Sequence, residues 1–222
     1  RFDTNSPYMV PEFSREQLFT RGSTKPVDEF YEAKALGYHT RPVLLGPVTY
    51  LKLGKSKDPE LDPLYLLDRL LPVYLQVLQR LMQAGATWIQ IDEPCLVTDL
   101  DDTSRQALRQ TYEMFAREVP SLRIMLASYF GKLGDNLDLA VSLPVAGLHV
   151  DLVRAPEQLE ELNARAPRRL VLSLGVIDGR NVWRANLAKI LDRLEPVVRQ
   201  RGNGHIEIAP SCSMIHVPVD LE

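Results

Sequence analysis

Short apolar runs recur along this chain, and several end abruptly in polar or chain-breaking residues. The clearest is 87–94, which reads Thr-Trp-Ile-Gln-Ile-Asp-Glu-Pro. This pattern is typical of a strand that is buried along its length and emerges at a functional rim. Comparable strand segments are predicted at 41–47, 123–129, 147–153, 170–176 and 206–212.

Segments with helical spacing separate these strands. The strongest begins at Asp62-Pro63, an N-cap acceptor followed by proline at the first helical position, and its apolar stripe ends before Gly85. Pro72 lies inside the stripe, where it is expected to kink the helix or leave one carbonyl to water. Other helices are expected at 26–36, from Thr103 or Ser104 to near Pro120, at 134–143, at 156–166 and from Asn181 onward.

The alternation of strand and helix, with connections too long for hairpins, indicates an α/β fold with parallel strands. The chain offers roughly seven strands, including a candidate edge strand at 9–13 that contains Pro11. A closed eight-stranded barrel typically needs about 250 residues. We therefore expect residues 1–222 to form a single domain, a TIM (β/α)8-type barrel that is incomplete because its first βα unit and last helix are missing.

Composition narrows the possible partners. The chain has 222 residues, of which 45% are hydrophobic, and a net charge of −3. It therefore lacks the basic footprint of a nucleic-acid-binding protein. No apolar run approaches the roughly 18 residues needed to cross a membrane, so we expect a soluble, cytoplasmic protein. The two cysteines form no disulfide framework, and the four histidines show no metal-ligand spacing.

Asp92 and Glu93 are the first candidates for chemistry. As neighbours on one strand, their side chains point to opposite faces, so one of them can face the mouth of a barrel. Such a carboxylate could hold an amine or hydroxyl of a small ligand. It could equally cap a loop or pair with an arginine such as Arg41 or Arg154, and the residue types alone do not separate these alternatives.

Other strand ends also carry reactive side chains. Asp151 shares a strand face with His149, but a histidine satisfied by a backbone carbonyl is the more frequent arrangement. Cys212 would need a base such as His216 to act as a nucleophile, and a cysteine at a strand end is more often a packing residue. A hydrolase with Glu93 and Asp151 as acid and base ranks last, because no sugar-stacking aromatic accompanies them in the sequence.

Several stretches, in a consistent order, carry a family resemblance: Phe-Asp-Thr-Asn at 2–5 with Met-Val-Pro-Glu at 9–12, Arg-Pro-Val-Leu-Leu-Gly-Pro-Val-Thr at 41–49, Ile-Gln-Ile-Asp-Glu-Pro at 89–94, Gly-Leu-His-Val-Asp-Leu-Val at 147–153, Asp-Gly-Arg-Asn-Val-Trp-Arg-Ala at 178–185, and Pro-Ser-Cys-Ser at 210–213 with His-Val-Pro at 216–218. Together they resemble the N-terminal domain of cobalamin-independent methionine synthase. The resemblance implies a barrel similar to those of methionine synthase and uroporphyrinogen decarboxylase.

In that family, two barrels lie face to face. The C-terminal barrel carries a zinc ion that activates the thiol of homocysteine, and the methyl donor, 5-methyltetrahydropteroyltri-L-glutamate, binds between the barrels. The resemblance implies that this chain belongs to a methyltransferase of methionine biosynthesis whose C-terminal barrel is its partner. It also implies that the chain contributes scaffolding and part of the folate site, and that alone it is inactive.

The resemblance implies no metal and no catalytic residue in this chain. Matching the strands to the catalytic barrel places Leu126 and Ser128 at a histidine and a cysteine ligand, Asp151 at a glutamate ligand and Cys212 at the last cysteine. Two plausible ligands of four remain, whereas a zinc site normally needs at least three protein ligands. Gly179 stands where the catalytic barrel has a histidine proposed as an acid.

Five residues remain as weak or vestigial candidates for substrate binding: Asn5, Asp92, Glu93, Asp151 and Cys212. In the family, the region of Asn5 approaches the polyglutamate tail of the folate. The alternative is a free-standing barrel that binds a folate or an amino acid without catalysis.

Overall fold

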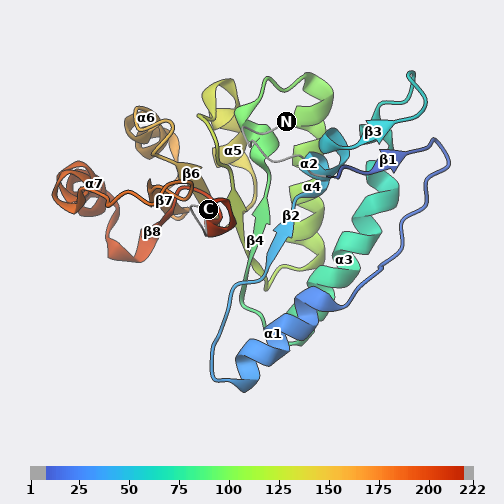
Figure 1. The fold of residues 1–222 in the computed structure, drawn as a ribbon, viewed down its shortest axis with the longest axis horizontal. Helices are drawn as coiled ribbons and strands as arrows, with labels where there is room; N and C mark the ends of the chain where they lie inside the picture. Colours follow the sequence, from blue (N-terminus) through green and yellow to red (C-terminus); the bar gives the residue numbers. More distant parts are fainter. Residues whose placement is uncertain (1–8, 218–222) are drawn as a thin grey trace, which may run out of the picture.

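A six-stranded parallel sheet forms the centre of the protein (Figure 1), whose computed structural model describes residues 9–217. The strand order is β2-β4-β5-β6-β7-β8. The strands are β2 (Val43–Leu45), β4 (Trp88–Asp92), β5 (Arg123–Ala127), β6 (Gly147–Asp151), β7 (Val171–Ile177) and β8 (Ile206–Pro210). The predicted α/β class with parallel strands is confirmed.

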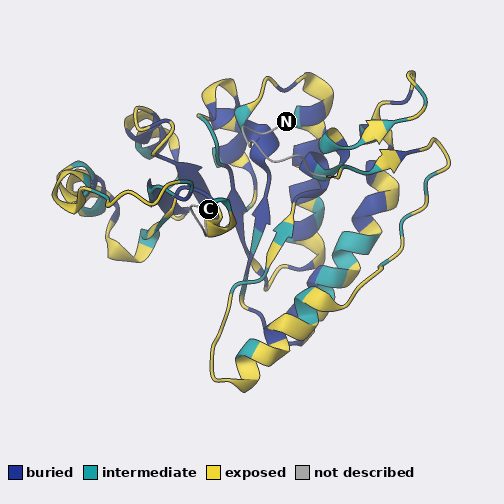
Figure 2. Cartoon of the chain, in the orientation of Figure 1, coloured by how far each residue is buried: buried dark blue, intermediate teal, exposed yellow. Residues whose placement is uncertain are grey.

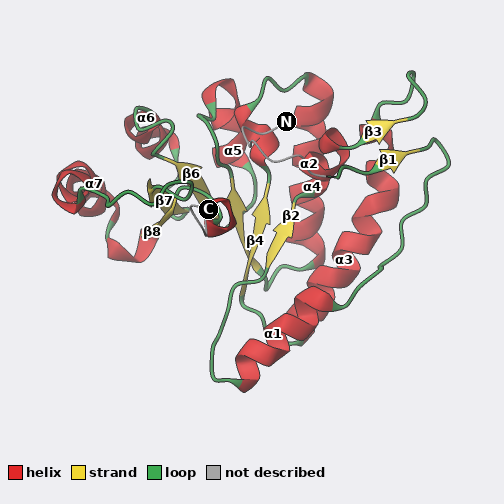
Figure 3. Ribbon diagram, in the orientation of Figure 1, coloured by secondary structure: helices red, strands yellow, loops and turns green. Residues whose placement is uncertain are grey.

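Helices connect and flank these strands (Figure 3), as parallel pairing requires. They are α1 (Lys25–Ala35), α2 (Pro47–Leu53), α3 (Leu67–Gln83), α4 (Asp102–Glu118), α5 (Leu137–Ser142), α6 (Gln158–Arg165) and α7 (Leu187–Arg201). Short 3₁₀ turns are η1 (Pro63–Leu66), η2 (Pro94–Val97), η3 (Gly134–Asn136), η4 (Asn203–His205) and η5 (Met214–His216). Within residues 9–217, every helix is too short or too polar to span a bilayer.

The core lies between the sheet and the helices, where Figure 2 shows the central strands β4 to β7 as largely buried. Alternation along β4 illustrates the two faces: Ile89 and Ile91 are fully buried in the apolar cluster, whereas Gln90 hydrogen-bonds to Asp92 on the other face. Leu71 of α3 belongs to the same cluster. The apolar face of the sheet therefore packs on helices, and the polar face carries the candidate chemistry.

Helix starts were predicted with mixed success. Asp62 caps η1 as expected, since its carboxylate accepts a hydrogen bond from the Leu64 amide at 3.0 Å. The expected caps at Thr103 or Ser104 and at Asn181 are wrong. Asp101 caps α4 and Asn186 caps α7, each accepting from an amide three residues ahead. Adjacent cap-forming residues compete, and packing of the following helix decides between them.

Pro72 is tolerated inside α3, which runs continuously from Leu67 to Gln83. Pro196 occupies a similar place in α7, which sequence analysis did not anticipate. Each proline leaves the carbonyl four residues earlier without its helical partner. Both helices have one exposed side, where such a carbonyl can be hydrated.

The candidate strand at 9–13 does not join the main sheet, so that part of the prediction is wrong. Its last two residues form β1 (Glu12–Phe13), which pairs in parallel with β3 (Lys55–Ser56) in a separate two-stranded sheet. Both α2 and β3 were missed because each is too short to show a clear hydrophobic period. Phe13 is buried in the core and anchors this small sheet.

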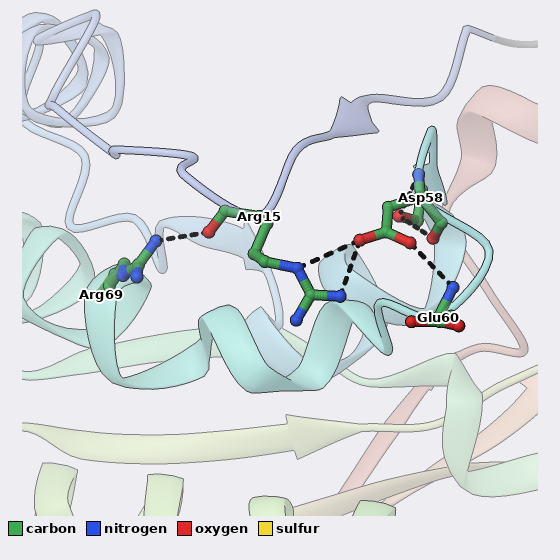
Figure 4. Close-up of polar contacts among 5 residues, drawn as sticks. Arg15, Asp58, Glu60 and Arg69 are labelled. Carbon is green, nitrogen blue, oxygen red and sulfur yellow. Dashed lines mark hydrogen bonds and ion pairs between the residues drawn. The ribbon is translucent and has the colours of Figure 1, made fainter.

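Polar side chains fasten the loop after β1 to the body of the protein (Figure 4). The Arg15 guanidinium donates to Asp58 at 2.7 and 3.1 Å, and Arg69 of α3 donates to the Arg15 carbonyl at 2.8 Å. The Arg15 hydrogen bond holds the pKa of the Asp58 carboxyl below its usual range. These contacts are exposed, so they fix the loop position more than they stabilise the fold.

The main sheet has two edges, β2 and β8, which are not hydrogen-bonded to one another, so a closed barrel is not shown. The sheet nevertheless curves enough for its edges to meet through side chains. Arg41, just before β2, donates two hydrogen bonds to Glu207 of β8, at 2.7 and 2.9 Å. The Arg41 and Arg123 guanidinium groups each lie over the Trp88 ring, 4.8 and 4.1 Å from its centroid.

We expect Gly54→Ala to lower the free energy of unfolding by about 1–3 kcal/mol. The added methyl would lie 2.1 Å from Cε2 of Phe13, and that buried ring is held edge-on by Phe19 and Tyr50. Urea denaturation measures the loss. Gly204→Ala is the matched control, because no atom lies within 4 Å of its added methyl. Equal losses in both variants would contradict the prediction.

Candidate functional site

The carboxyl ends of strands β4 to β8 lie together at one end of the sheet, here called the mouth. Asp92 ends β4, Asp151 ends β6 and Cys212 follows β8. Because these strands run in parallel, the structure brings the three candidates to the same side, as the sequence predicted. Asn5, the remaining candidate besides Glu93, lies outside the described residues.

Asp92 faces the mouth and is held by side chains. Its carboxylate accepts hydrogen bonds from Gln90 Nε2 at 2.8 Å and from the Tyr129 hydroxyl at 3.0 Å. The side chain is 8% exposed, and burial raises the pKa of its carboxyl group. Each oxygen retains acceptor capacity, so Asp92 is suited to hold a hydrogen-bond donor such as an amine.

Glu93 points the opposite way, into the protein. It is fully buried, and its carboxylate accepts from the backbone amides of Val48 at 3.3 Å and Thr49 at 2.7 Å, in the first turn of α2. A carboxylate there also interacts favourably with the helix dipole. A methyl group on Gly46 would lie 2.1 Å from Glu93 Cδ, so the close approach needs glycine. Glu93 therefore does not face a cavity shared with Asp151.

Within the part of the chain that the structure describes, backbone amides bind the Asp151 carboxylate. One carboxylate oxygen accepts from the amides of Val153 and Arg154, both at 2.9 Å, and the other accepts from the amide of Phe130 at 3.1 Å. Three of its roughly four acceptor positions are thus occupied. The side chain is 1% exposed, which leaves little access for a ligand.

His149 takes the structural role that sequence analysis favoured. Its Nδ1 lies 2.9 Å from Ser173 Oγ, and its Nε2 lies 3.3 Å from the Ser211 carbonyl oxygen. A carbonyl only accepts, so Nε2 carries the proton and Nδ1 accepts from the serine hydroxyl. Burial lowers the pKa of His149, which favours this neutral form. Both ring nitrogens are committed, so His149 and Asp151 do not act as an acid-base pair.

Cys212 is a poor nucleophile in this setting. The residue is 6% exposed, and burial raises the pKa of its thiol to about 11. The reactive thiolate is therefore scarce near neutral pH. His216, the proposed base, packs edge-on against Phe130 instead. Gly179 allows the loop to approach, since a methyl there would lie 2.9 Å from the Cys212 sulfur.

Three residues at the mouth were not predicted from the sequence: Tyr129, Phe130 and Arg180. The Tyr129 and Phe130 rings meet edge-on with centroids 4.8 Å apart, and the Arg180 guanidinium lies 5.4 Å from the centroid of Phe130. Tyr129 hydrogen-bonds Asp92. The available signal was an aromatic pair at the end of the strand predicted at 123–129, directly before a glycine.

The residues matched to the zinc ligands do not fit a metal. Leu126 and Ser128 are buried, Asp151 is occupied by backbone amides, and the Cys212 thiol favours its protonated form. In the part of the chain that the structure describes, no three histidine, cysteine or acidic side chains come together as a metal site would require.

The raised pKa of the buried Glu93 carboxyl group should make the stability of the protein depend on pH. Burial raises its pKa from 4.5 to about 7, so between these values the unfolded chain loses a proton that the folded chain keeps. The free energy of unfolding should fall as pH rises from 4.5 to 7, by on the order of 3 kcal/mol from this group. Urea denaturation across this range should show a smaller decline for Glu93→Gln. Glu113→Gln, exposed on α4, is the matched control, and a decline unchanged by Glu93→Gln would contradict the assignment.

Solved structures share the fold. A B12-independent methionine synthase from a Shewanella species, in complex with selenomethionine, matches with a TM-score of 0.70 and 14% identity, covering 95% of this chain and 65% of that one. A methyltransferase from Methanosarcina mazei matches with a TM-score of 0.55 and 19% identity, covering 82% and 56%. At these identities the likeness concerns the fold alone.

Sequence relatives identify the family. A Nitrobacter winogradskyi protein named 5-methyltetrahydropteroyltriglutamate-homocysteine methyltransferase is 66% identical over 220 residues, 99% of this chain and 28% of that protein. The protein of the same name in Salinibacter ruber is 52% identical over 222 residues, 100% of this chain and 29% of that protein. The family described as cobalamin-independent synthase, N-terminal domain, matches residues 1–202. The chain therefore belongs to the family of cobalamin-independent synthase N-terminal domains.

Proposed function

We propose that this chain is the N-terminal, non-catalytic part of an enzyme that transfers a methyl group from 5-methyltetrahydropteroyltri-L-glutamate to homocysteine. Its relatives are named for that activity, and the chain spans about 28% of the length of the Nitrobacter winogradskyi protein. The observation that carries the non-catalytic role is the Asp151 carboxylate, which three backbone amides occupy. The zinc and the reacting thiol then belong to the C-terminal barrel of the same cytoplasmic polypeptide.

We further propose that residues 1–222 form one domain, an incomplete barrel. A single apolar cluster includes residues from α1 to α7, which supports one domain. The edge strands leave large apolar side chains uncovered: Val43 and Leu45 on β2 and Ile208 on β8 are 55%, 39% and 57% exposed. Parallel sheets in soluble proteins are normally covered on both faces. Additional strand and helix outside these 222 residues would cover these edges.

The mouth has the surface expected of a docking face for the C-terminal barrel. Five apolar residues project after β6, β7 and β8: Val153, Val182, Trp183, Met214 and Ile215. Trp183 and Ile215 are 80% and 83% exposed, and Val153 and Trp183 line one hollow of about 400 Å³. Exposed apolar groups gathered at one edge are typical of an interaction surface. The folate polyglutamate would bind at this interface.

A free-standing binding domain is the second candidate function. The Asp92 carboxylate at the mouth, with Tyr129 beside it, favours this alternative, because the pair offers both an acceptor and a hydroxyl to a small polar ligand. Calorimetry of the isolated chain with folates and sulfur amino acids separates the two functions. Clear binding without any partner domain would support the alternative.

The isolated chain should neither hold zinc nor transfer methyl groups. After incubation with zinc and gel filtration, we expect well under one equivalent of zinc per chain, and no methionine when homocysteine and the methyl donor are supplied. Atomic absorption and chromatography measure these outcomes. The longer polypeptide that contains this chain is the positive control. Turnover by the isolated chain, or stoichiometric zinc held by Asp151 and Cys212, would overturn the proposed function.

A further inference from the structure

Phe130 has an unusual backbone conformation. Among residues 9–217 it is the only non-glycine residue with a positive φ, at +74°. For a bulky side chain, this conformation is a steric outlier that persists only where surrounding contacts hold it. Such outliers gather at functional sites, so the contacts that hold Phe130 are informative.

The Asp151 carboxylate holds the backbone of Phe130. The β5–β6 pairing continues to the hydrogen bond from the Ser128 amide to the His149 carbonyl, at 3.0 Å. Beyond it, the Phe130 amide donates to one Asp151 oxygen at 3.1 Å. The other Asp151 oxygen accepts from two amides of the next loop. Asp151 therefore joins the loop after β5 to the loop after β6, at the point where the ladder ends.

The restrained residue is the centre of the aromatic cluster at the mouth. The Phe130 ring contacts Tyr129, with centroids 4.8 Å apart, and His216, with centroids 5.2 Å apart. Arg180 lies over the same ring. Through Tyr129 the cluster reaches Asp92. Displacement of Phe130 would disturb residues at the carboxyl ends of four strands, β4, β5, β7 and β8.

We propose that Asp151 is a positioning residue, whose carboxylate holds Phe130 in the left-handed conformation and so fixes the Tyr129–Phe130 aromatic pair at the mouth. This role differs from metal ligation and from binding substrate directly. It rests on the proposed function only in that the mouth is the face turned toward ligand and partner.

Asp151→Asn tests the proposal with a nearly isosteric change. The amide oxygen can still accept from Val153 and Arg154, but the amide nitrogen then faces the Phe130 amide, and two donors cannot pair. We expect the crystal structure of this variant to show Phe130 with a negative φ. We also expect the midpoint of the His216 titration, followed by NMR, to shift by several tenths of a pH unit, because the contact between the His216 and Phe130 rings is lost.

The matched control is Asp101→Asn. Asp101 also accepts a backbone amide, that of Ser104 at 2.7 Å, but it lies at the start of α4 and asparagine is an equally good N-cap. We expect the control to leave the φ of Phe130 and the His216 titration unchanged. A positive φ and an unchanged His216 titration in Asp151→Asn would overturn the proposal.

A double-mutant cycle covers the case in which Asp151→Asn is too unstable to crystallise. Phe130→Gly tolerates positive φ and keeps the backbone amide that donates to Asp151, but it removes the aromatic ring. The loss of Tm caused by Asp151→Asn should be smaller when Phe130→Gly is also present, because the ring contacts with Tyr129 and His216 are then already absent. An equal loss in both backgrounds would overturn the proposal. None of these measurements needs a substrate. They therefore test the role of Asp151 even if the proposed function is wrong.

Discussion

The parallel pairing of the six-stranded sheet is the constraint on which the rest of the structure depends. Each parallel pair of strands needs a crossover connection, and helices form these connections. All carboxyl ends of the strands therefore lie at the mouth, which brings Asp92, Asp151 and Cys212 to the same side although they are far apart in the sequence. The same constraint leaves β2 and β8 as open edges, and the Arg41–Glu207 ion pair connects them.

Three acids near the mouth have different roles because the backbone points them in different directions. Glu93 turns inward and binds the first turn of α2, whereas Asp92 turns to the mouth and accepts from two side chains. Asp151 is engaged by backbone amides and holds the strained Phe130. Backbone amides therefore engage two of these acids, and Asp92 keeps acceptor capacity at the mouth.

Much of the fold could be predicted from local patterns. The apolar run before Asp92 and the cap at Asp62 identified their elements, because burial and capping leave direct signals in the sequence. The strand expected at 9–13 was misplaced because pairing partners are not encoded locally. The short helix α2 shows no period, yet it explains the burial of Glu93.

The sequence by itself determined the α/β class, most strand positions, the opposite directions of Asp92 and Glu93 and the family, because these follow from periodicity and co-linear motifs. Only the tertiary structure decided which of the two acids faces the mouth, what holds Asp151, and that Phe130 belongs to the site. Those outcomes depend on hydrogen bonds and ring contacts between segments distant in the chain, and no local pattern records such contacts.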